Sequence, residues 1–264
     1  MIFRPFFIQA NSAPTTYGLQ LPAESSSLIL RFNLKLREFC VAQFAIVTVI
    51  ISLCLFAYIF TNLTGHGLLL GFLSLLDVGN EQSIPTYVSV INLLLASLLI
   101  LIIYRYEKIN KQNYSGYWLF LAIVFIYLSI DESASIHEKF SNIHNFLVSK
   151  ELISPILNTH SWLPFGAFFI TVVAIVLLPL LRNLPTDTLT YFLTAGCVFV
   201  MGAVGFEYVG ALMLETGFVE SKADTAFLVR RIFEEGFEMY GIAIFNIALY
   251  REILRREISV IIGG

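Results

Sequence analysis

Carboxylate and imidazole side chains that suit a metal ion lie together at the end of an apolar run. In the segment YLSIDESASIHEKF, residues 127–140, a nearly uninterrupted hydrophobic stretch is followed by Asp131, Glu132, His137 and Glu138. This set of ligands suits Fe, Mn, Mg or Ca, and Zn where more than one histidine contributes. A metal ion at this place would support hydrolytic or redox chemistry.

A second acidic group lies near the C-terminus, in the segment RRIFEEGFE that begins at Arg230. Glu234 and Glu235 precede Glu238 by four and three residues, so all three project to one side of a helix. The same spacing predicts two local ion pairs, Arg230–Glu234 and Arg231–Glu235. Local pairing therefore leaves Glu238 without a basic partner.

The composition places these charged groups in a membrane protein. The chain has 264 residues, of which 57% are hydrophobic and 13% are charged, whereas a soluble domain carries about 25% charged residues. Several apolar runs approach the length that spans a bilayer. With a formal net charge of −3, the chain lacks the basic footprint of a nucleic-acid-binding protein, and no nucleic-acid partner is predicted.

The fold expected from these runs is all-α, a polytopic membrane bundle of six transmembrane helices. Each run is long enough to cross a hydrocarbon core of about 30 Å at about 1.5 Å per residue. The predicted spans are residues 40–61, 85–104, 117–136, 161–181, 189–208 and 226–250. The connection over residues 65–84 contains an apolar stretch too short to span, which indicates an interfacial or re-entrant segment.

The placement of Lys and Arg predicts the orientation of the bundle. With six spans, one side receives most of the basic residues and is expected to be cytoplasmic. They are Arg31, Lys35, Arg37, Arg105, Lys108, Lys111, Arg182, Arg251, Arg255 and Arg256. Both termini are therefore predicted to be cytoplasmic, in a multi-pass protein of the cell (plasma or inner) membrane. The predicted domains are a flexible cytoplasmic tail (1–38), a six-helix transmembrane domain (39–251) and a short cytoplasmic tail (252–264).

This orientation brings acidic groups of three spans into one layer on the extracytoplasmic side. Counting at about 1.5 Å per residue places Asp131 about 21 Å, Glu207 about 27 Å and Glu238 about 18 Å from the cytoplasmic boundary. A charged residue near the bilayer centre costs about 2.5–3.5 kcal/mol on insertion scales. The layer therefore needs compensation from a cation, Arg partners, protonation or a water-filled cavity.

Helical periodicity predicts which way these groups face. At about 100° per residue, Asp131, Ser135 and Glu138 share a face, and His137 shares its face with His144 if the third helix continues. The fifth helix carries small residues on the same face as Glu207, namely Gly196, Ala203, Gly210 and Ala211. Because small residues let a neighbouring helix approach closely, that glutamate is predicted to point into the bundle.

The predicted site is a divalent-metal site built from three helices. The expected ligands are Asp131, Glu132, His137, Glu138, Glu207, Glu234, Glu235 and Glu238, with Glu81 and His144 in an outer shell. The ligand types do not distinguish Fe, Mn, Zn, Mg and Ca. His66 and His160 are expected to lie at the membrane interface instead.

Together, the motifs resemble those of an uncharacterised family of bacterial and archaeal multi-pass membrane proteins. The pattern is an acidic loop D…NE…IPT, a helix with DE…HE and a final helix with EE..E and a glycine. It is carried by Asp77, Asn80, Glu81, Ile84, Pro85, Thr86, Asp131, Glu132, His137, Glu138, Glu234, Glu235, Glu238 and Gly241. The resemblance spans about residues 70–250 and implies that the motifs act as one unit, but it implies no activity.

Three classes of function fit these features. The first is a metal-dependent membrane enzyme, a hydrolase or oxidoreductase acting on a lipid or small-molecule substrate. The second is a proton- or cation-coupled transporter or channel, which is disfavoured because no comparable charged site is expected in the cytoplasmic half. The third is a membrane assembly or scaffold subunit whose acidic groups pair with a partner. No oligomeric state is predicted.

Overall fold

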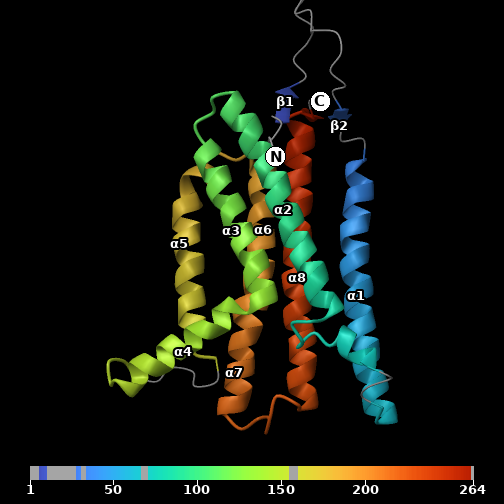
Figure 1. Ribbon diagram of the computed structural model, residues 1–264, viewed down its shortest axis with the longest axis vertical. Coiled ribbons are helices and arrows are strands. Elements are labelled where there is room, and N and C mark those ends of the chain that lie inside the picture. The colour runs from blue at the N-terminus through green and yellow to red at the C-terminus, as the bar shows by residue number, and fades with distance from the viewer. Residues whose placement is uncertain (1–5, 11–27, 31–33, 67–70, 155–159, 263–264) are drawn as a thin grey trace, which may run out of the picture.

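The computed structural model describes residues 6–10, 28–30, 34–66, 71–154 and 160–262 (Figure 1). Its helices are α1 (Leu36–Thr64), the short η2 (Leu73–Leu76), α2 (Ile84–Ile109), α3 (Ser115–Ala134), α4 (Ile136–Ser149), α5 (Leu163–Leu181), α6 (Thr186–Val200), α7 (Glu207–Glu215) and α8 (Thr225–Arg255). A π-helical segment, η3 (Met201–Phe206), joins α6 to α7, so the three form one long helix. The predicted all-α fold is confirmed.

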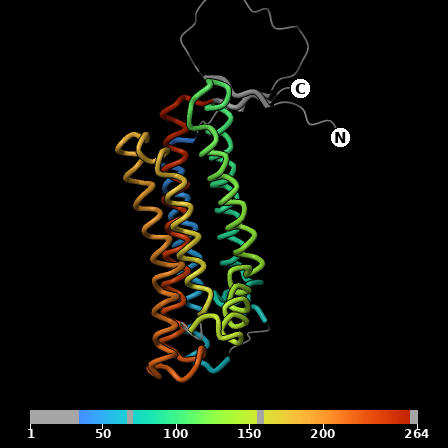
Figure 2. Tube along the Cα trace, turned by 90° about the vertical axis from the view of Figure 1, so that its left-hand side faces the viewer, coloured from blue at the N-terminus to red at the C-terminus, as the bar shows by residue number. Residues whose placement is uncertain are grey.

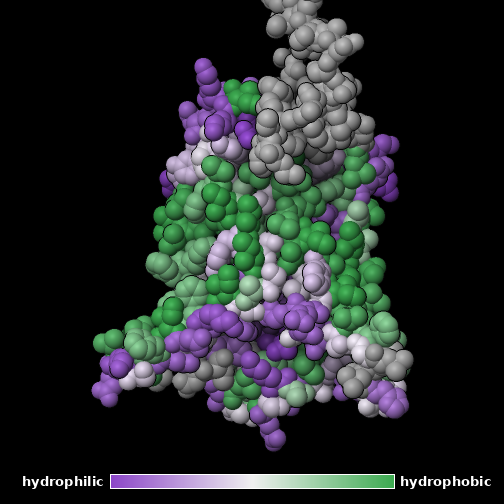
Figure 3. Space-filling view, in the orientation of Figure 1, coloured by the Kyte–Doolittle hydropathy of each residue, from purple (hydrophilic) through white to green (hydrophobic). Residues whose placement is uncertain are grey.

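Five helices in the described part of the chain are long and apolar enough to cross a membrane, namely α1, α2, α3, α5 and the helix from Thr186 to Glu215. They correspond to the first five predicted spans. The sixth, residues 226–250, lies within the 31-residue α8, which carries charged residues toward both ends and is not among the five. A hydrophobic belt covers the middle of the bundle in Figure 3. The protein therefore sits in a lipid bilayer.

The bundle is elongated, and its two ends differ (Figures 1 and 2). The start of α1 and the end of α8 lie together at what we call the terminal end. The helix α4, the end of α7 and the start of α8 lie at the opposite end, which we call the α4 end. The terminal end corresponds to the side predicted to be cytoplasmic, and its orientation in a membrane stays a prediction.

Three short strands lie at the terminal end. The strands β1 (Phe6–Ala10) and β2 (Leu28–Leu30) both pair antiparallel with β3 (Ile258–Ile262), so the sheet order is β1-β3-β2. Val260 is in register with Ile8 on one side and Leu30 on the other. The strands fall within the predicted tails, 1–38 and 252–264. The predicted flexibility of the first tail concerns mostly residues 1–5, 11–27 and 31–33, which lie outside the described residues.

Helix α8 lies at the centre of the bundle, where it packs against α1, α2, α6 and η3. Its second half is buried, with Met239, Leu249 and Ile253 fully covered. Phe245 stacks on Phe125 of α3 with ring centroids 4.7 Å apart. This packing anchors the helix that carries three of the predicted site glutamates.

A buried ion-pair network ties α8 to its neighbours at the terminal end. Glu252 is fully buried and accepts hydrogen bonds from Arg255 Nη2 and Arg256 Nε, both at 2.6 Å. Arg256 Nη1 donates to Glu107 Oε1 of α2 at 2.6 Å, and Thr188 of α6 donates to Glu252. Because these residues lie outside the predicted spans 85–104 and 226–250, the expectation that this half of the membrane lacks a comparable charged site stays a prediction. Helical spacing relates Glu252 to Arg255 and Arg256 at i, i+3 and i, i+4, but it could not reveal the contact of Arg256 with Glu107, which joins the end of α8 to α2.

The third predicted helix ends two residues earlier than expected, and its continuation turns. Ser135 has a left-handed backbone (φ 46°, ψ 47°), after which α4 lies across the end of the bundle (Figure 1). Asp131 favours this break because its side chain hydrogen-bonds the backbone of the next helix, in competition with a continued α3. The face predicted to be shared by Asp131, Ser135 and Glu138 is wrong, because these residues belong to two helices.

Candidate functional site

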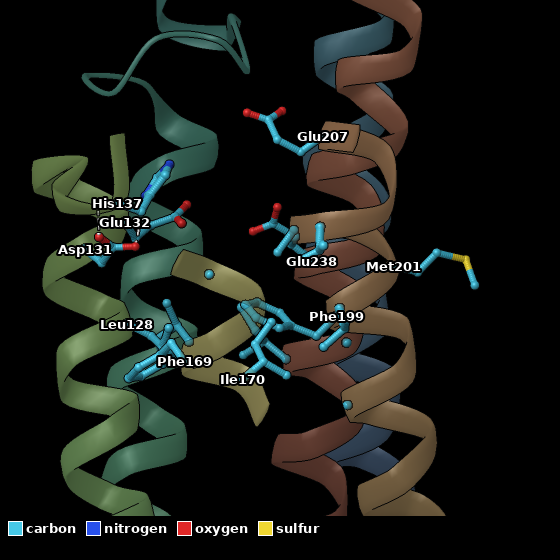
Figure 4. A pocket seen from close by; sticks show the side chains of 18 of the residues that line it. Leu128, Asp131, Glu132, His137, Phe169, Ile170, Phe199, Met201, Glu207 and Glu238 are labelled. Carbon is cyan, nitrogen blue, oxygen red and sulfur yellow. Dashed lines mark hydrogen bonds and ion pairs between the residues drawn. The ribbon is translucent and has the colours of Figure 1, made fainter. Parts of the chain in front are cut away.

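A cavity of about 1250 Å³ lies between helices α3 and α5 and the helices α6, η3 and α8. All eight predicted metal ligands line it, as does Glu81 from the loop before α2, whereas His144 on α4 does not. The carboxylates gather toward the α4 end. In Figure 4, Glu132 and Glu238 face each other across the space, with Phe169 and Phe199 on the apolar side of them. The cavity thus has an acidic half and an apolar half.

Asp131 holds the start of α4 and the ring of His137. Its Oδ1 atom accepts a hydrogen bond from the backbone N–H of His137 at 2.7 Å, and its Oδ2 atom lies 2.9 Å from His137 Nδ1. A carboxylate at a helix N-terminus also complements the helix dipole. Burial opposes the charged imidazolium, but Asp131 and the nearby Glu138 and Glu207 carboxylates outweigh it, so the pKa of His137 is raised above its usual value. The ring packs edge-on against Trp162.

Arg230 links two of the predicted ligands across helices. The Arg230 side chain is only 5% exposed, and its guanidinium forms ion pairs with Glu234 on α8 and Glu207 on α7. Its Nη1 atom also donates to the Phe206 carbonyl at 2.8 Å. The predicted Arg230–Glu234 pair is confirmed. The partner of Glu207 was missed, because Arg230 lies 23 positions away in the sequence and helical spacing relates only near neighbours.

His160 is a site residue that the sequence did not single out. It was expected at the interface, but it is buried, lines the cavity, and has Nε2 3.6 Å from Glu207 Oε1. Burial lowers the pKa of His160, and the nearby cationic side chains reinforce this effect against the pull of Glu207. The position of His160 could not be predicted from the sequence, because it depends on how the loop before α5 packs against α7.

Four predicted carboxylate ligands line the cavity without an ion pair to a basic side chain among the described residues, and one of them, Glu138, lies on α4. Glu132, Glu235 and Glu238 form no ion pair with any Lys or Arg that the structure describes. The predicted Arg231–Glu235 pair is not formed, because the Arg231 guanidinium lies instead against Gly79 and over the Phe227 ring.

The net charge of the cavity wall follows from its described lining residues. The carboxylates are Glu81, Asp131, Glu132, Glu138, Glu207, Glu234, Glu235 and Glu238, and the permanently basic residues are Lys222, Arg230 and Arg231. Fully ionised, the wall would carry an excess of about five negative charges, since each of the three basic residues cancels one of the eight carboxylates. When these carboxylates are ionised, the acidic half of the cavity is therefore a strongly negative environment.

The predicted ligands line one cavity but do not converge on one point. Across the described residues, no group of three or more His, Cys, Asp or Glu side chains is close enough together to hold a metal ion. Glu132 comes from α3, while Glu235 and Glu238 come from α8 on the opposite wall. Metal binding at this site consequently stays a proposal.

Close packing of η3 on α8 sets the position of Glu238. A Cβ atom added at Gly202 would lie 2.6 Å from Glu238 Cγ, and one added at Gly241 would lie 2.7 Å from Phe199 Cβ. Of the small residues predicted to form a helix contact, Gly210 abuts Arg230 and Ala211 is buried, but Gly196 faces open space. A π-helical segment rotates the residues on either side of it relative to an ideal α-helix, so a single helical wheel could not predict the whole face.

The apolar half of the cavity was not predicted. Its lining comes from four helices and includes Leu121, Phe125, Leu128, Phe169, Val173, Leu177, Phe192, Phe199, Ile242 and Phe245. In a membrane helix, apolar residues that line a cavity have the same types as those that face lipid or pack in the core. The sequence therefore carries no signal that separates them.

The helices and the cavity define a multi-pass helical membrane protein with a half-acidic, half-apolar cavity. Comparison with protein families matches residues 41–252 to the family described as Domain of unknown function (DUF8692), and the chain belongs to this family. The match contains every predicted ligand. No curated protein and no solved structure matches the chain.

Proposed function

We propose that the protein binds a divalent cation in the acidic half of the cavity and uses it to hydrolyse a ligand held there. Glu132, Glu235 and Glu238 are the proposed ligands. The observation that carries this proposal is that these three carboxylates, from two facing helices, line the cavity without a basic partner among the described residues.

Charge compensation is the physical argument for a cation. A carboxylate inside the hydrocarbon region costs about 2.5–3.5 kcal/mol on insertion scales, and the cost grows when like charges face one another. Arg230 compensates Glu207 and Glu234. A divalent cation between Glu132 and Glu238 would offset the remaining repulsion where they face each other (Figure 4).

The donor atoms favour a hard cation. Carboxylate oxygens are the ligands that Mg²⁺, Ca²⁺ and Mn²⁺ accept in proteins, and Mg²⁺ commonly keeps several waters of its own. A cavity of about 1250 Å³ leaves room for such waters. Bound hard cations polarise carbonyl or phosphoryl oxygens and activate water, so hydrolysis is the reaction class that we propose.

His137 is suited to join the ligands. Metal-binding histidines usually donate their other ring N–H to a carboxylate, which fixes the ring orientation. Asp131 makes this contact with Nδ1 at 2.9 Å. Because Nδ1 is engaged with Asp131, Nε2 would be the nitrogen that binds the cation. Asp131 would then position the ligand instead of binding the metal itself.

Elemental analysis of the purified protein tests the proposal. We expect about one divalent cation per chain in wild type and loss of most of it in Glu235→Gln and Glu238→Gln, because amide oxygens carry no charge. Glu215→Gln is the matched control, since Glu215 is exposed at the end of α7 and does not line the cavity. Wild type without a stoichiometric cation would overturn the proposal.

For the alternative function, cation transport, one structural observation is favourable and another is unfavourable. The ion-pair network of Glu107, Glu252 and Arg256 is a second polar cluster at the terminal end. Between it and the cavity carboxylates, however, Ile100 and Ala248 belong to a closely packed hydrophobic core. We therefore expect no Glu238-dependent cation flux in proteoliposomes. A scaffold role would instead be supported if Glu238→Gln changed complex formation but altered neither cation content nor flux.

A further inference from the structure

We propose that the apolar half of the cavity holds the hydrocarbon chain of a membrane amphiphile whose headgroup carries no net negative charge. The headgroup would lie among the carboxylates of the acidic half. This inference names the substrate class of the proposed hydrolytic site, and it rests on the proposed function for the reaction but not for binding of the chain.

The cavity has the size that a hydrocarbon chain requires. Its volume of about 1250 Å³ exceeds the range of about 300–1,000 Å³ that is typical of small-molecule pockets. On α5, the cavity lining begins at Phe165. Its part from Phe169, next to the level of Glu132 in Figure 4, to Leu181 corresponds to about 18 Å at about 1.5 Å per residue. One leaflet of the hydrocarbon core is about 15 Å thick, so the apolar half matches the length of a lipid chain.

The helix that walls the cavity is loosely packed. Of the 19 residues of α5, the buried ones are Leu163, Leu177 and Leu180, and the helix packs mainly against α3 and η3. Opposite it, Gly196 of α6 leaves open space, because a Cβ atom there would meet nothing within 4 Å. A chain can therefore enter sideways from the bilayer along α5, without passing through water.

The two halves of the cavity meet at the level of Glu132 and Glu238. In Figure 4, Leu128, Phe169, Ile170 and Phe199 lie next to these carboxylates on the apolar side. A molecule that fills both halves must therefore be apolar at one end and polar at the other. A wholly polar solute would leave the apolar half unfilled, and a wholly apolar one would leave the carboxylates without compensation.

The headgroup determines selectivity, because lipid tails are as apolar as the cavity wall and moving a chain between them changes the free energy little. Fully ionised, the described wall would carry about five more acidic than basic charges, and one divalent cation would leave an excess of about three. An anionic headgroup is disfavoured by this charge. Amine-bearing or neutral headgroups are favoured.

Photolabelling of the full-length protein in phosphatidylcholine nanodiscs tests the inference. The probes are hexadecylamine and palmitic acid that carry the same diazirine in the chain, with butylamine as a short-chain competitor. We expect the amine probe to label peptides of α5 and α6 at least about tenfold more than the acid probe, which equals about 1.4 kcal/mol. Unlabelled hexadecylamine should compete, and butylamine should not. Equal labelling by the two probes, or labelling outside the cavity lining, would overturn the inference.

Filling the cavity provides the variant. Gly196→Leu places a side chain in the open space of the apolar half and should reduce labelling about tenfold, while Gly116→Leu should not. Gly116 is the matched control, because a Cβ atom there also meets nothing within 4 Å and it lies outside the cavity lining. Ala174→Phe on the α5 wall gives a second, independent obstruction. Unchanged labelling in folded Gly196→Leu and Ala174→Phe would refute binding in this half.

Cation content measured on the same samples separates the two proposals. Wild type that contains the cation but is not labelled would overturn the amphiphile inference and leave the proposed function standing. Wild type that is labelled but contains no cation would overturn the proposed function and support binding of the chain. Gly196→Leu should keep its cation, because Gly196 lies about 9 Å along the helix, at about 1.5 Å per residue, from Gly202, which packs on the proposed ligand Glu238.

Discussion

Arg230 is the residue whose loss should destabilise the fold most directly. It compensates Glu207 and Glu234, donates to the Phe206 carbonyl, and lies over the Phe227 ring at 4.5 Å, with its side chain 5% exposed. Arg230→Gln would leave two half-buried carboxylates without a cation. Breaking a buried ion pair by removing one partner costs about 3–5 kcal/mol. A loss of this size lowers the ratio of folded to unfolded protein more than about a hundredfold. We expect a loss of that size in the free energy of unfolding.

The assay is denaturant unfolding of the protein in detergent micelles, followed by tryptophan fluorescence, to which Trp162 at the cavity contributes. Arg231→Gln is the matched control, because Arg231 is adjacent on α8 but forms no ion pair with the described carboxylates, and we expect a change within about 1 kcal/mol. Adding Glu234→Gln to Arg230→Gln should recover part of the loss by removing one uncompensated charge. If Arg230→Gln is no less stable than Arg231→Gln, or if the second substitution recovers nothing, the assignment of Arg230 as the compensating cation is refuted.

Two further predictions concern the geometry of the site. Gly202→Val should lower the free energy of unfolding by about 1–3 kcal/mol through overpacking, because its Cβ atom would lie 2.6 Å from Glu238 Cγ. Gly196→Ala should instead raise the free energy of unfolding by about 0.5–1 kcal/mol. Equal effects of the two substitutions in the same unfolding assay would contradict this packing. The raised pKa of His137 predicts a contribution to stability that is fully present below the unfolded pKa of about 6.5 and is lost as the pH rises through the folded pKa. Thermal unfolding of protein freed of cations with EDTA, between pH 5.5 and 8.5, should show this loss in wild type but not in Asp131→Asn, because a bound cation would itself keep His137 neutral. The same pH profile in both proteins would argue against the Asp131–His137 pair.

The membrane class and the main helices could be predicted because they depend on local chain properties. A low content of charged residues and apolar runs of nearly 20 residues are enough to identify spanning helices. Depth counting from the span boundaries also brought Asp131, Glu207 and Glu238 to one layer, and the structure places all three at one cavity. The error at the end of the third helix came from a local competition, since Asp131 caps α4 where periodicity predicted a continued α3.

The partners of these residues could not be predicted in the same way. Arg230 reaches Glu207, His160 lies beside it, and Glu107 meets Arg256 across the bundle. Each contact joins residues far apart in the sequence, and no periodic pattern encodes which two helices are neighbours. The π-helical segment adds a rotation that a regular helical wheel does not contain.

The sequence by itself determined that this is a helical membrane protein whose carboxylates lie at similar depth, because hydrophobicity, helix rise and the cost of charge in lipid act on each segment separately. Only the tertiary structure decided which carboxylates Arg230 compensates, which remain facing the cavity, and that this cavity continues into an apolar half along α5. Those outcomes depend on how helices pack, which is set by close contacts such as that of Gly202 with Glu238 and not by any one segment.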